Sequence, residues 1–482
     1  MKLNFKSLLF LGVGSKFTKE LLENFVNANL TISRVVTIKS FQSEKLKFNR
    51  DIELIELDFF EINKGNYPNL NYLQRPVDCE IYNIINKELL TILKIMDRLD
   101  IYKYYKFDER ISLVFEHLKF WFNLLLNKHI DLVISTDMPH EAQDYIAYLL
   151  ADYFKIKKCF LVQSQIPQFY QILENIETND SRLLEYKSNE FNDKIIESDL
   201  INQYFQDQKS IEYEPFYMKN NYENIFSKFR KTLSKINQAL QRVYKKKYYK
   251  INNLLNYVFL RKNYGNAASK KLKTNYLQKS ITPNLDKKYI YVPLHYQPER
   301  TTAPQGGLFA FQELMIEMLS KSIPSDWYLY IKEHPKQKIN GRYIEYYDNL
   351  TKFKNVVLID NKIKSFELIQ KSISVATVTG TAGWEAVCFE KPVLLFGNIF
   401  FQYAPGVFKI KNNSDLINSI QKIIQNQTGI SKPNLIKFLN CVSKYSYHGF
   451  SDELYFPHAN ISWEKNLIDI NKNINDFIGN AS

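Results

Sequence analysis

The stretch Ile290-Tyr-Val-Pro-Leu-His-Tyr-Gln-Pro-Glu-Arg300 decides the fold of the second half of this chain. Its apolar beginning has the composition of a buried β-strand, and the strand pattern stops abruptly at polar residues. The run Leu329-Tyr-Ile-Lys-Glu-His-Pro335 repeats this arrangement. In an open α/β sheet, ligands bind beyond the carboxyl ends of the strands. The two strand ends therefore predict a phosphate-handling site formed by His295, Gln297, Glu299, Arg300, Lys332 and His334.

Strands and helices alternate on both sides of these motifs. From residue 288 onward, the pattern predicts strands at 289–294, 327–331, 355–359, 374–378 and 392–396, with helices at 309–321, 343–353 and 365–371 and a further helix that ends at Phe389. Such alternation indicates a parallel sheet with helices on both faces. The tail from residue 415 on is predicted to be largely helical.

The first half begins in the same way. Strands are predicted at 7–14, 32–38, 130–135 and 158–163, and helices at 17–30, 88–126 and 142–154. Residues 170–285 are polar and Asn-rich, and we interpret them as helical insertions and a linker. We expect an α/β domain at 1–284, a second α/β domain at 285–425, and a helical tail at 426–482 that packs back on the first domain. Two doubly wound Rossmann-type α/β domains facing a cleft indicate the GT-B architecture.

Bulk composition excludes several classes of protein. The chain has 482 residues, enough for two or three domains, with 45% hydrophobic and 24% charged residues. No run of eighteen apolar residues occurs, so no transmembrane helix is expected, and the start at Met1 is interpreted as a buried strand rather than a signal peptide. The four cysteines are scattered without a C-x-x-C pair, which favours free thiols in a reducing cytoplasm.

The formal charge of +13 has two interpretations. One is compositional drift, because Lys and Asn are abundant throughout. The other is a functional field, because residues 242–279 contain no acidic residue and mix Lys and Arg with aromatic side chains. That mixture suits the anionic inner surface of a membrane, which would make the protein peripheral. No nucleic-acid-binding motif is present, so nucleic acid is not an expected partner.

The turn Thr379-Gly-Thr-Ala-Gly-Trp-Glu385 lies where a predicted strand meets a helix. The first turn of a helix leaves amide groups unpaired, and its dipole favours an anion. We therefore expect an anionic donor substrate to bind here, at Thr379, Gly380, Thr381, Ala382, Gly383 and Glu385. The alternative is that Thr381 merely caps the helix. His334-Pro335 ends a strand on the same sheet edge, so His334 is a candidate to protonate a departing phosphate.

The loop residues Asp137, His140 and Glu141 are candidates for the general base that takes a proton from an acceptor hydroxyl. Asp137 and Glu141 could equally sit at a helix N-terminus for dipole reasons. Arg300 could clamp a carboxylate or phosphate. No D-x-D, H-E-x-x-H, P-loop or G-x-S-x-G motif occurs, so we expect no metal and no cofactor, and we do not expect protease, NTPase or α/β-hydrolase chemistry.

Three motifs together resemble the capsule polysaccharide biosynthesis family, which includes bacterial Kdo transferases. They are residues 295–302, residues 327–335, and residues 379–386 with Lys391-Pro-Val-Leu-Leu-Phe-Gly397. The resemblance is strong over 288–410 and loose over 131–167. It implies a metal-independent GT-B glycosyltransferase that uses a CMP-activated acidic sugar such as Kdo or a nonulosonic acid. On this resemblance, the domain at 285–425 would bind the nucleotide sugar and the domain at 1–284 would lie on the acceptor side. His334-Pro335 would contact the CMP phosphate, with Thr379 and Thr381 in place of the more usual serine.

The implied acceptor is a growing surface polysaccharide or lipid-linked glycan. Two alternatives stay open at this point. One is a polyol-phosphate transferase that uses CDP-glycerol, which also releases CMP. The other is a non-catalytic nucleotide-sugar-binding component of a capsule assembly complex. The sequence leaves the transferred sugar, the stereochemical course and the oligomeric state undetermined.

Overall fold

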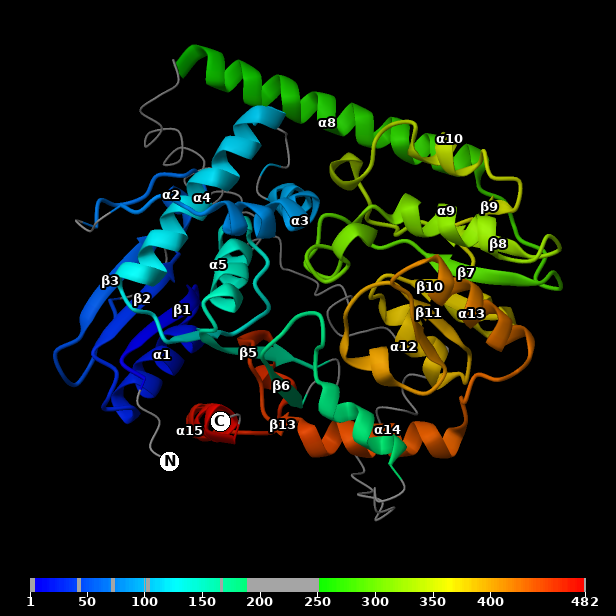
Figure 1. Cartoon of the computed structure of the whole chain (residues 1–482). Helices are drawn as coiled ribbons and strands as arrows, with labels where there is room; N and C mark the ends of the chain where they lie inside the picture. Colours follow the sequence, from blue (N-terminus) through cyan, green and yellow to red (C-terminus); the bar gives the residue numbers. More distant parts are fainter. Residues whose placement is uncertain are drawn as a thin grey trace.

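In the computed structural model, two lobes each carry one sheet, and the tail returns to the first lobe (Figure 1). The structure describes residues 5–40, 45–70, 74–98, 100, 105–164, 168–188 and 251–480, with the backbone alone described for 251–264. This is the α/β, GT-B-like arrangement of two doubly wound domains that the strand and helix pattern predicted.

The first sheet has seven strands in the order β13-β6-β5-β4-β1-β2-β3. All neighbours are parallel except at one edge, where β6 pairs antiparallel with β5 and with β13. Their bounds are β1 Ser7–Val13, β2 Arg34–Lys39, β3 Glu53–Asp58, β4 Leu132–Ser135, β5 Lys157–Gln163, β6 Phe169–Leu173 and β13 Tyr447–His448.

Alternate residues of the first sheet enter two different cores, because successive strand side chains point to opposite faces. Leu9 and Leu11 pack with helices α3, α4 and α5, whereas Leu8 and Phe10 pack with α1 and α15. The helices are α1 Lys16–Ala28, α2 Phe59–Ile62, α3 Cys79–Met96, α4 Phe107–Asn127, α5 Ala142–Tyr153 and the 3-10 helix η1 Ser181–Lys187.

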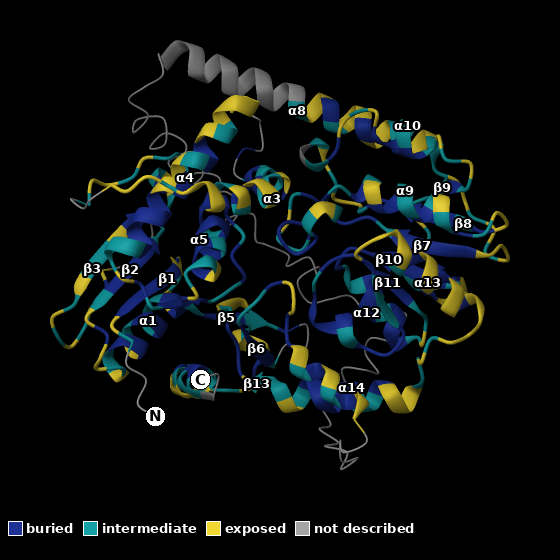
Figure 2. Cartoon of the chain, viewed as in Figure 1, coloured by how far each residue is buried: buried dark blue, intermediate teal, exposed yellow. Residues whose placement is uncertain are grey.

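The second sheet has six parallel strands in the order β12-β11-β10-β7-β8-β9. Its strands are β7 Tyr289–Pro293, β8 Tyr328–Lys332, β9 Val356–Leu358, β10 Ser374–Thr377, β11 Val393–Leu395 and β12 Val407–Lys409. Around it lie α8 Ile251–Lys279, α9 Gln312–Ser322, α10 Tyr346–Leu350, α11 Ser365–Lys371, α12 Thr381–Cys388, α13 Asn413–Ile424 and the 3-10 helices η2 Gly307–Ala310, η3 Ile339–Gly341 and η4 Phe400–Tyr403. Buried residues concentrate in the strands of both lobes (Figure 2).

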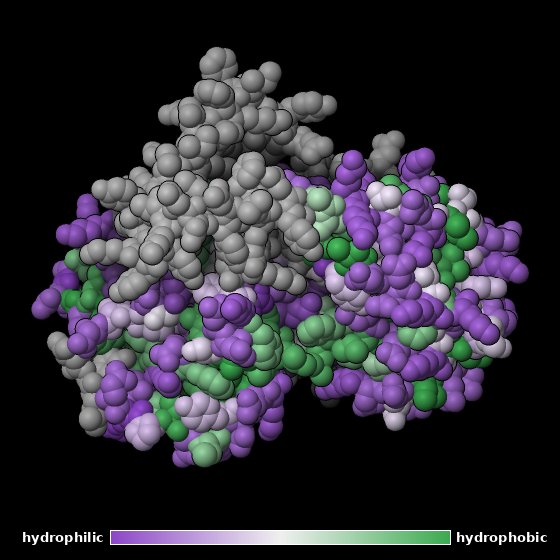
Figure 3. Space-filling view, turned by 90° about the horizontal axis from the view of Figure 1, so that it is seen from above, coloured by the Kyte–Doolittle hydropathy of each residue, from purple (hydrophilic) through white to green (hydrophobic). Residues whose placement is uncertain are grey.

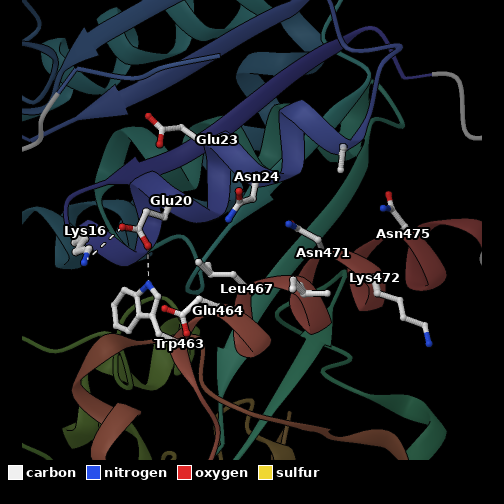
Figure 4. Close-up of a pocket in the computed structure, with 12 residues that line it drawn as sticks. Lys16, Glu20, Glu23, Asn24, Trp463, Glu464, Leu467, Asn471, Lys472 and Asn475 are labelled. Carbon is white, nitrogen blue, oxygen red and sulfur yellow. Dashed lines mark hydrogen bonds and ion pairs between the residues drawn. The ribbon is translucent and has the colours of Figure 1, made fainter. Parts of the chain in front are cut away.

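The tail consists of α14 Lys432–Tyr445, strand β13, the 3-10 helix η5 Glu453–His458 and α15 Trp463–Asn480. Helix α14 packs on the second lobe, and α15 packs against α1 of the first lobe. Trp463 on α15 donates its indole N–H to Glu20 of α1 at 2.6 Å. A surface groove of about 730 Å³ runs between these two helices (Figure 4).

The structure differs from the sequence-based expectation in three places. The helical pattern at 88–126 is two helices, α3 and α4. The segment after 170, interpreted as helical, begins with strand β6. Helix α8 falls inside the range expected for the first domain, yet Leu272 and Tyr276 pack into the core of the second sheet. The expected domain boundary at 284/285 therefore falls after a helix that belongs with the second lobe.

No helix in the described part of the chain is long and apolar enough to cross a membrane.

Candidate functional site

Strand β7 lies at the point where the strand order of the second sheet reverses. Its neighbour on one side is β8 and on the other side β10, and the chain leaves β7 toward β8 before it returns to β10. In doubly wound sheets, ligands bind in the crevice that such a reversal opens at the carboxyl ends. His295 follows β7, and the 379–383 turn follows β10. The topology thus brings two of the predicted motifs together.

His295, which follows β7, contacts the turn that follows β10. The amide of Thr379 donates to its Nε2 at 3.2 Å, and the hydroxyl of Thr377 lies 3.0 Å from the same nitrogen. Because Nε2 accepts from an amide, the ring proton is on Nδ1. Burial lowers the pKa of His295 to about 3, so the ring is neutral near pH 7. The sequence predicted His295 as a donor contact, and the structure gives its Nε2 a role in holding the turn.

The glycines of the turn are required by protein contacts. A Cβ on Gly380 would lie 2.8 Å from the hydroxyl oxygen of Thr377 and 3.3 Å from the His295 ring. A Cβ on Gly383 would lie 2.8 Å from the methyl group of Thr377 and 3.1 Å from the Phe401 ring. Glycine therefore allows the turn to press against β10 and His295, which fixes the direction of its amides.

Helix α12 begins at Thr381, and Gly380 occupies the N-cap position without a side-chain cap. Thr381 is therefore not the cap that the alternative interpretation proposed. Its hydroxyl hydrogen-bonds Glu385, while the Thr379 hydroxyl donates to the carbonyl of Thr301. The amides of Thr379, Gly380 and Gly383 are bonded within the protein, so the amides of Thr381 and Ala382 are the groups of this turn suited to bind an anion.

Glu385 and Lys332 lie beside the turn. Burial raises the pKa of Glu385 to about 7, and the positive charge of Lys332 opposes that shift. Lys332 donates to the carbonyl of Ile363 at 2.5 Å and to the hydroxyl of Ser365 at 3.3 Å. Burial also lowers the pKa of Lys332. The site therefore holds one carboxyl and one amine whose charges depend on what binds near them.

His334 precedes Pro335 at the end of β8, half-buried against Tyr296 with ring centres 5.4 Å apart. Its Nδ1 accepts the amide of Lys336 at 3.2 Å, so the neutral ring carries its proton on Nε2. Burial lowers the pKa of His334, and a positive charge on its ring would lower the pKa of His295. The second imidazole therefore lies near the first and presents a donor nitrogen.

A buried ion pair that sequence reasoning missed supports the loop after β7. Arg342 is fully buried and bonds Glu333 at 3.0 Å and the carbonyl of His295 at 2.9 Å. Its guanidinium also bonds the side-chain oxygen of Gln297, whose amide group donates to Ala310. Gln297, predicted to contact the donor, is thus engaged within the protein. The feature of the sequence that could have indicated this ion pair was Glu333, because a carboxylate buried between Lys332 and His334 needs a cationic partner.

The predicted base residues lie in the loop between β4 and α5. His140 lies 2.7 Å from the carbonyl of Met138 and 3.7 Å from Asp137, and burial lowers its pKa to about 4. Glu141 is the N-cap residue of α5, but its side chain accepts no hydrogen bond from the helix amides. No such contact therefore supports the interpretation that Glu141 lies there to interact with the helix dipole. Burial raises the pKa of Glu141 to about 7. Near neutral pH, Glu141 is therefore poised to gain or lose a proton.

The loop after β7 also reaches the first lobe. Arg300 forms an ion pair with Asp137, which joins a predicted donor residue to a predicted base. Burial raises the pKa of the neighbouring Glu299, and the Arg98 charge opposes that shift. Nearby, the Lys94 ammonium lies 4.3 Å from the centre of the Phe311 ring. The two lobes are in contact here, around a cavity of only about 10 Å³.

The groove between α1 and α15 contains none of the predicted site residues, and its labelled lining residues come from those two helices (Figure 4). In the described residues, no group of three or more His, Cys, Asp or Glu side chains could hold a metal ion.

Residues 198–416 match the model of a family described as capsule polysaccharide biosynthesis protein. This match confirms the resemblance that the three motifs indicated. A search of curated proteins found no match.

Several solved structures are similar in fold. The β-Kdo 2,7 transferase KpsC of Thermosulfurimonas dismutans has 11% identity and a TM-score of 0.31, covering 82% of this chain and 97% of that chain. The UDP-GlcNAc 2-epimerase of Neisseria meningitidis bound to UDP-GlcNAc has 13% identity and a TM-score of 0.24, covering 91% and 99%. A glycosyltransferase of Rickettsia africae has 14% identity and a TM-score of 0.27, covering 98% and 99%. At these identities and TM-scores, none of them indicates which substrate this chain uses.

Proposed function

We propose that this protein is a glycosyltransferase that moves an acidic sugar, Kdo or a nonulosonic acid, from a CMP-sugar to a surface polysaccharide or glycolipid. The observation that carries the proposal is the turn at 379–383, held by His295 at the strand reversal of the second sheet. The amides of Thr381 and Ala382 in this turn suit a phosphate. The family match supports a role in capsule synthesis.

In the proposed reaction, the bond between the anomeric carbon and a CMP phosphate oxygen breaks, and its electron pair stays on the phosphate. A new bond forms between that carbon and an acceptor hydroxyl oxygen. The hydroxyl proton passes to a carboxylate of the first lobe, for which Asp137 and Glu141 are the candidates. His334 donates a hydrogen bond from Nε2 to the departing phosphate, and a donor placed where charge develops accelerates such a step.

The test is CMP release from CMP-Kdo and from a CMP-nonulosonate, each with and without a lipid-linked glycan acceptor. We expect release that depends on the acceptor for one of these donors. CDP-glycerol is included as a competing donor, because turnover of that compound alone would favour the polyol-phosphate alternative. Binding of CMP without turnover of any donor would instead favour a non-catalytic role. If CMP does not bind at all, the proposed function is wrong.

We also propose that helix α8 holds the protein at an anionic membrane surface. Ala268, Leu272 and Tyr276 are buried on the second lobe, so Lys270, Lys271 and Lys273 face outward. Of the basic segment 242–279, residues 242–250 lie outside the described residues. Seen from above, hydrophilic side chains predominate on the described surface of the second lobe (Figure 3).

Replacing these three lysines by glutamine is expected to weaken binding to vesicles containing anionic lipid by about 100-fold, since each contributes about 1 kcal/mol near such a surface. Vesicle co-sedimentation at low and high salt measures this effect. The matched control replaces the exposed residues Lys362, Lys422 and Lys432 by glutamine. Equal loss in both triple variants would point to net charge alone and contradict a role for α8.

A further inference from the structure

Two residues with different predicted roles bind each other in this structure. Asp137 follows β4 at the carboxyl edge of the first sheet, and Arg300 lies in the loop after β7 of the second sheet. Their ion pair therefore crosses between the lobes. The side chain of Arg300 is 31% exposed and that of Asp137 is 36% exposed, so a ligand that enters from solvent can reach both partners.

The ion pair blocks the predicted role of each residue, which is proton transfer for Asp137 and anion binding for Arg300. A carboxylate next to a guanidinium has a lowered affinity for protons, which makes it a poor base. A guanidinium that already holds a carboxylate has its best-matched donors engaged, so it binds a second anion less well. The paired state is thus unsuited both to donor binding by Arg300 and to proton transfer by Asp137.

Charged groups from several elements surround the pair. Asp452 and Tyr455 of the tail act on Arg300, as does the positive charge of Arg98. Arg98 also donates to the carbonyl of His140 at 3.2 Å, and its charge acts on Glu141, Asp144 and Glu299. Releasing Asp137 without a replacement anion would therefore leave the Arg300 guanidinium without its ion-pair partner and close to the positive charge of Arg98.

We propose that Arg300 is an exchange residue, which holds Asp137 in the empty enzyme and takes the carboxylate of the donor sugar in the complex. The inference rests on the proposed function, because it requires an acidic sugar on the donor. One carboxylate replaces another, so the guanidinium stays neutralised throughout. The released Asp137 carboxylate no longer faces the guanidinium and remains beside His140, from which it lies 3.7 Å away in the paired state.

The exchange also selects the donor. A sugar with a carboxylate next to the anomeric carbon can displace Asp137 from Arg300, whereas a neutral sugar offers no charge to replace it. Arg300 is therefore a specificity residue as well as a switch. In the empty enzyme Asp137 stays paired, and a nucleotide sugar without a carboxylate would bind without freeing it.

The test measures binding of CMP and of a CMP-nonulosonate to the full chain by calorimetry. Asp137→Asn removes the internal competitor, so we expect about fivefold tighter binding of the CMP-nonulosonate and an unchanged affinity for CMP. Arg300→Gln is expected to weaken CMP-nonulosonate binding at least tenfold, again with CMP unchanged. Arg34→Gln is the control, because it breaks an exposed ion pair with Glu53 at 2.7 Å, at the amino end of β2.

The opposite signs of the two effects distinguish exchange from a structural role. If Asp137→Asn and Arg300→Gln both weaken the CMP-nonulosonate, or both change CMP as well, the pair is a structural contact and the inference is wrong. If the unaltered protein binds neither CMP nor the CMP-nonulosonate, the proposed function itself fails and the exchange fails with it. If CMP binds but neither variant changes CMP-nonulosonate affinity, only the exchange is overturned.

Discussion

The carboxyl edges of the two sheets differ in how far their polar groups are satisfied by the protein. At the second sheet, His295, Thr377 and Thr379 bond one another and fix the turn before any ligand binds. At the first sheet, Glu141 and Asp144 are carboxyl groups whose pKa values burial raises to about 7 and about 8. We infer that the edge of the second sheet, the proposed donor site, is preorganised, whereas the edge of the first sheet, the proposed acceptor site, is held in a state that a bound substrate would change.

The largest expected effect comes from breaking the preorganised edge. Gly380→Ala places a Cβ 2.8 Å from the Thr377 hydroxyl oxygen, so the turn must move away from β10 and His295. We expect the affinity for CMP, measured by calorimetry, to fall about 100-fold.

Gly265→Ala is the matched control, because its Cβ meets nothing within 4 Å. In a helix this change is stabilising by about 1 kcal/mol. Unaltered CMP affinity in the Gly380→Ala variant would show that the turn does not bind the phosphate.

His334→Ala separates binding from chemistry at the same edge. The ring nitrogen Nε2 is proposed to act on the leaving phosphate, so kcat for CMP release should fall about 100-fold while CMP affinity changes little. His129→Asn is the control, since His129 is exposed and asparagine tolerates its positive φ of 46°. A variant at 334 with full kcat would remove the proposed leaving-group role.

The smallest effect concerns the unsatisfied edge. A carboxyl whose pKa is higher in the folded state than in the unfolded state releases a proton when the protein unfolds at a pH between the two values. The free energy of unfolding therefore falls as the pH rises through that range. For Asp144 this loss runs from its ordinary value of 3.8 to about 8. Asp144→Asn should therefore stabilise the protein more at pH 8.5 than at pH 4, measured by denaturant unfolding.

The exposed residue Asp476 provides the comparison for that experiment. Asp476→Asn should change stability by the same small amount at both pH values. If Asp144→Asn also shows no pH dependence, burial does not destabilise the ionised carboxyl at the edge of the first sheet. The contrast drawn between the two sheets is then wrong.

Sequence reasoning succeeded where a strand is apolar along its whole length. β1, β4, β7, β8 and β10 all fall within two residues of their expected bounds, because parallel strands buried on both faces give continuous hydrophobic runs. It missed β3, whose sequence Glu53-Leu-Ile-Glu-Leu-Asp58 is polar at an exposed sheet edge, and the three-residue strand β12. Each of these strands lies at the edge of its sheet and pairs with the strand before it in the sequence, β2 for β3 and β11 for β12.

The candidate site was predicted in part for the same reason. Strand ends located the turn at 379–383 and the two histidines, since topology brings carboxyl ends together. Side-chain partners could not be inferred, because they depend on loop paths. Arg342 reaches His295 from 47 positions away, and Arg300 reaches Asp137 over 163 positions. The roles assigned to the site residues remain predictions for the variants above.

The return of the tail has a consequence for how the protein is made. Leu467, Ile470, Ile474 and Ile478 of α15 are buried in the same core as Leu8 and Phe10 of β1. That core stays open until residues 463–480 leave the ribosome, by which time every strand of the second sheet has been synthesised. The lobe that begins first in the chain is therefore the one whose folding is completed last.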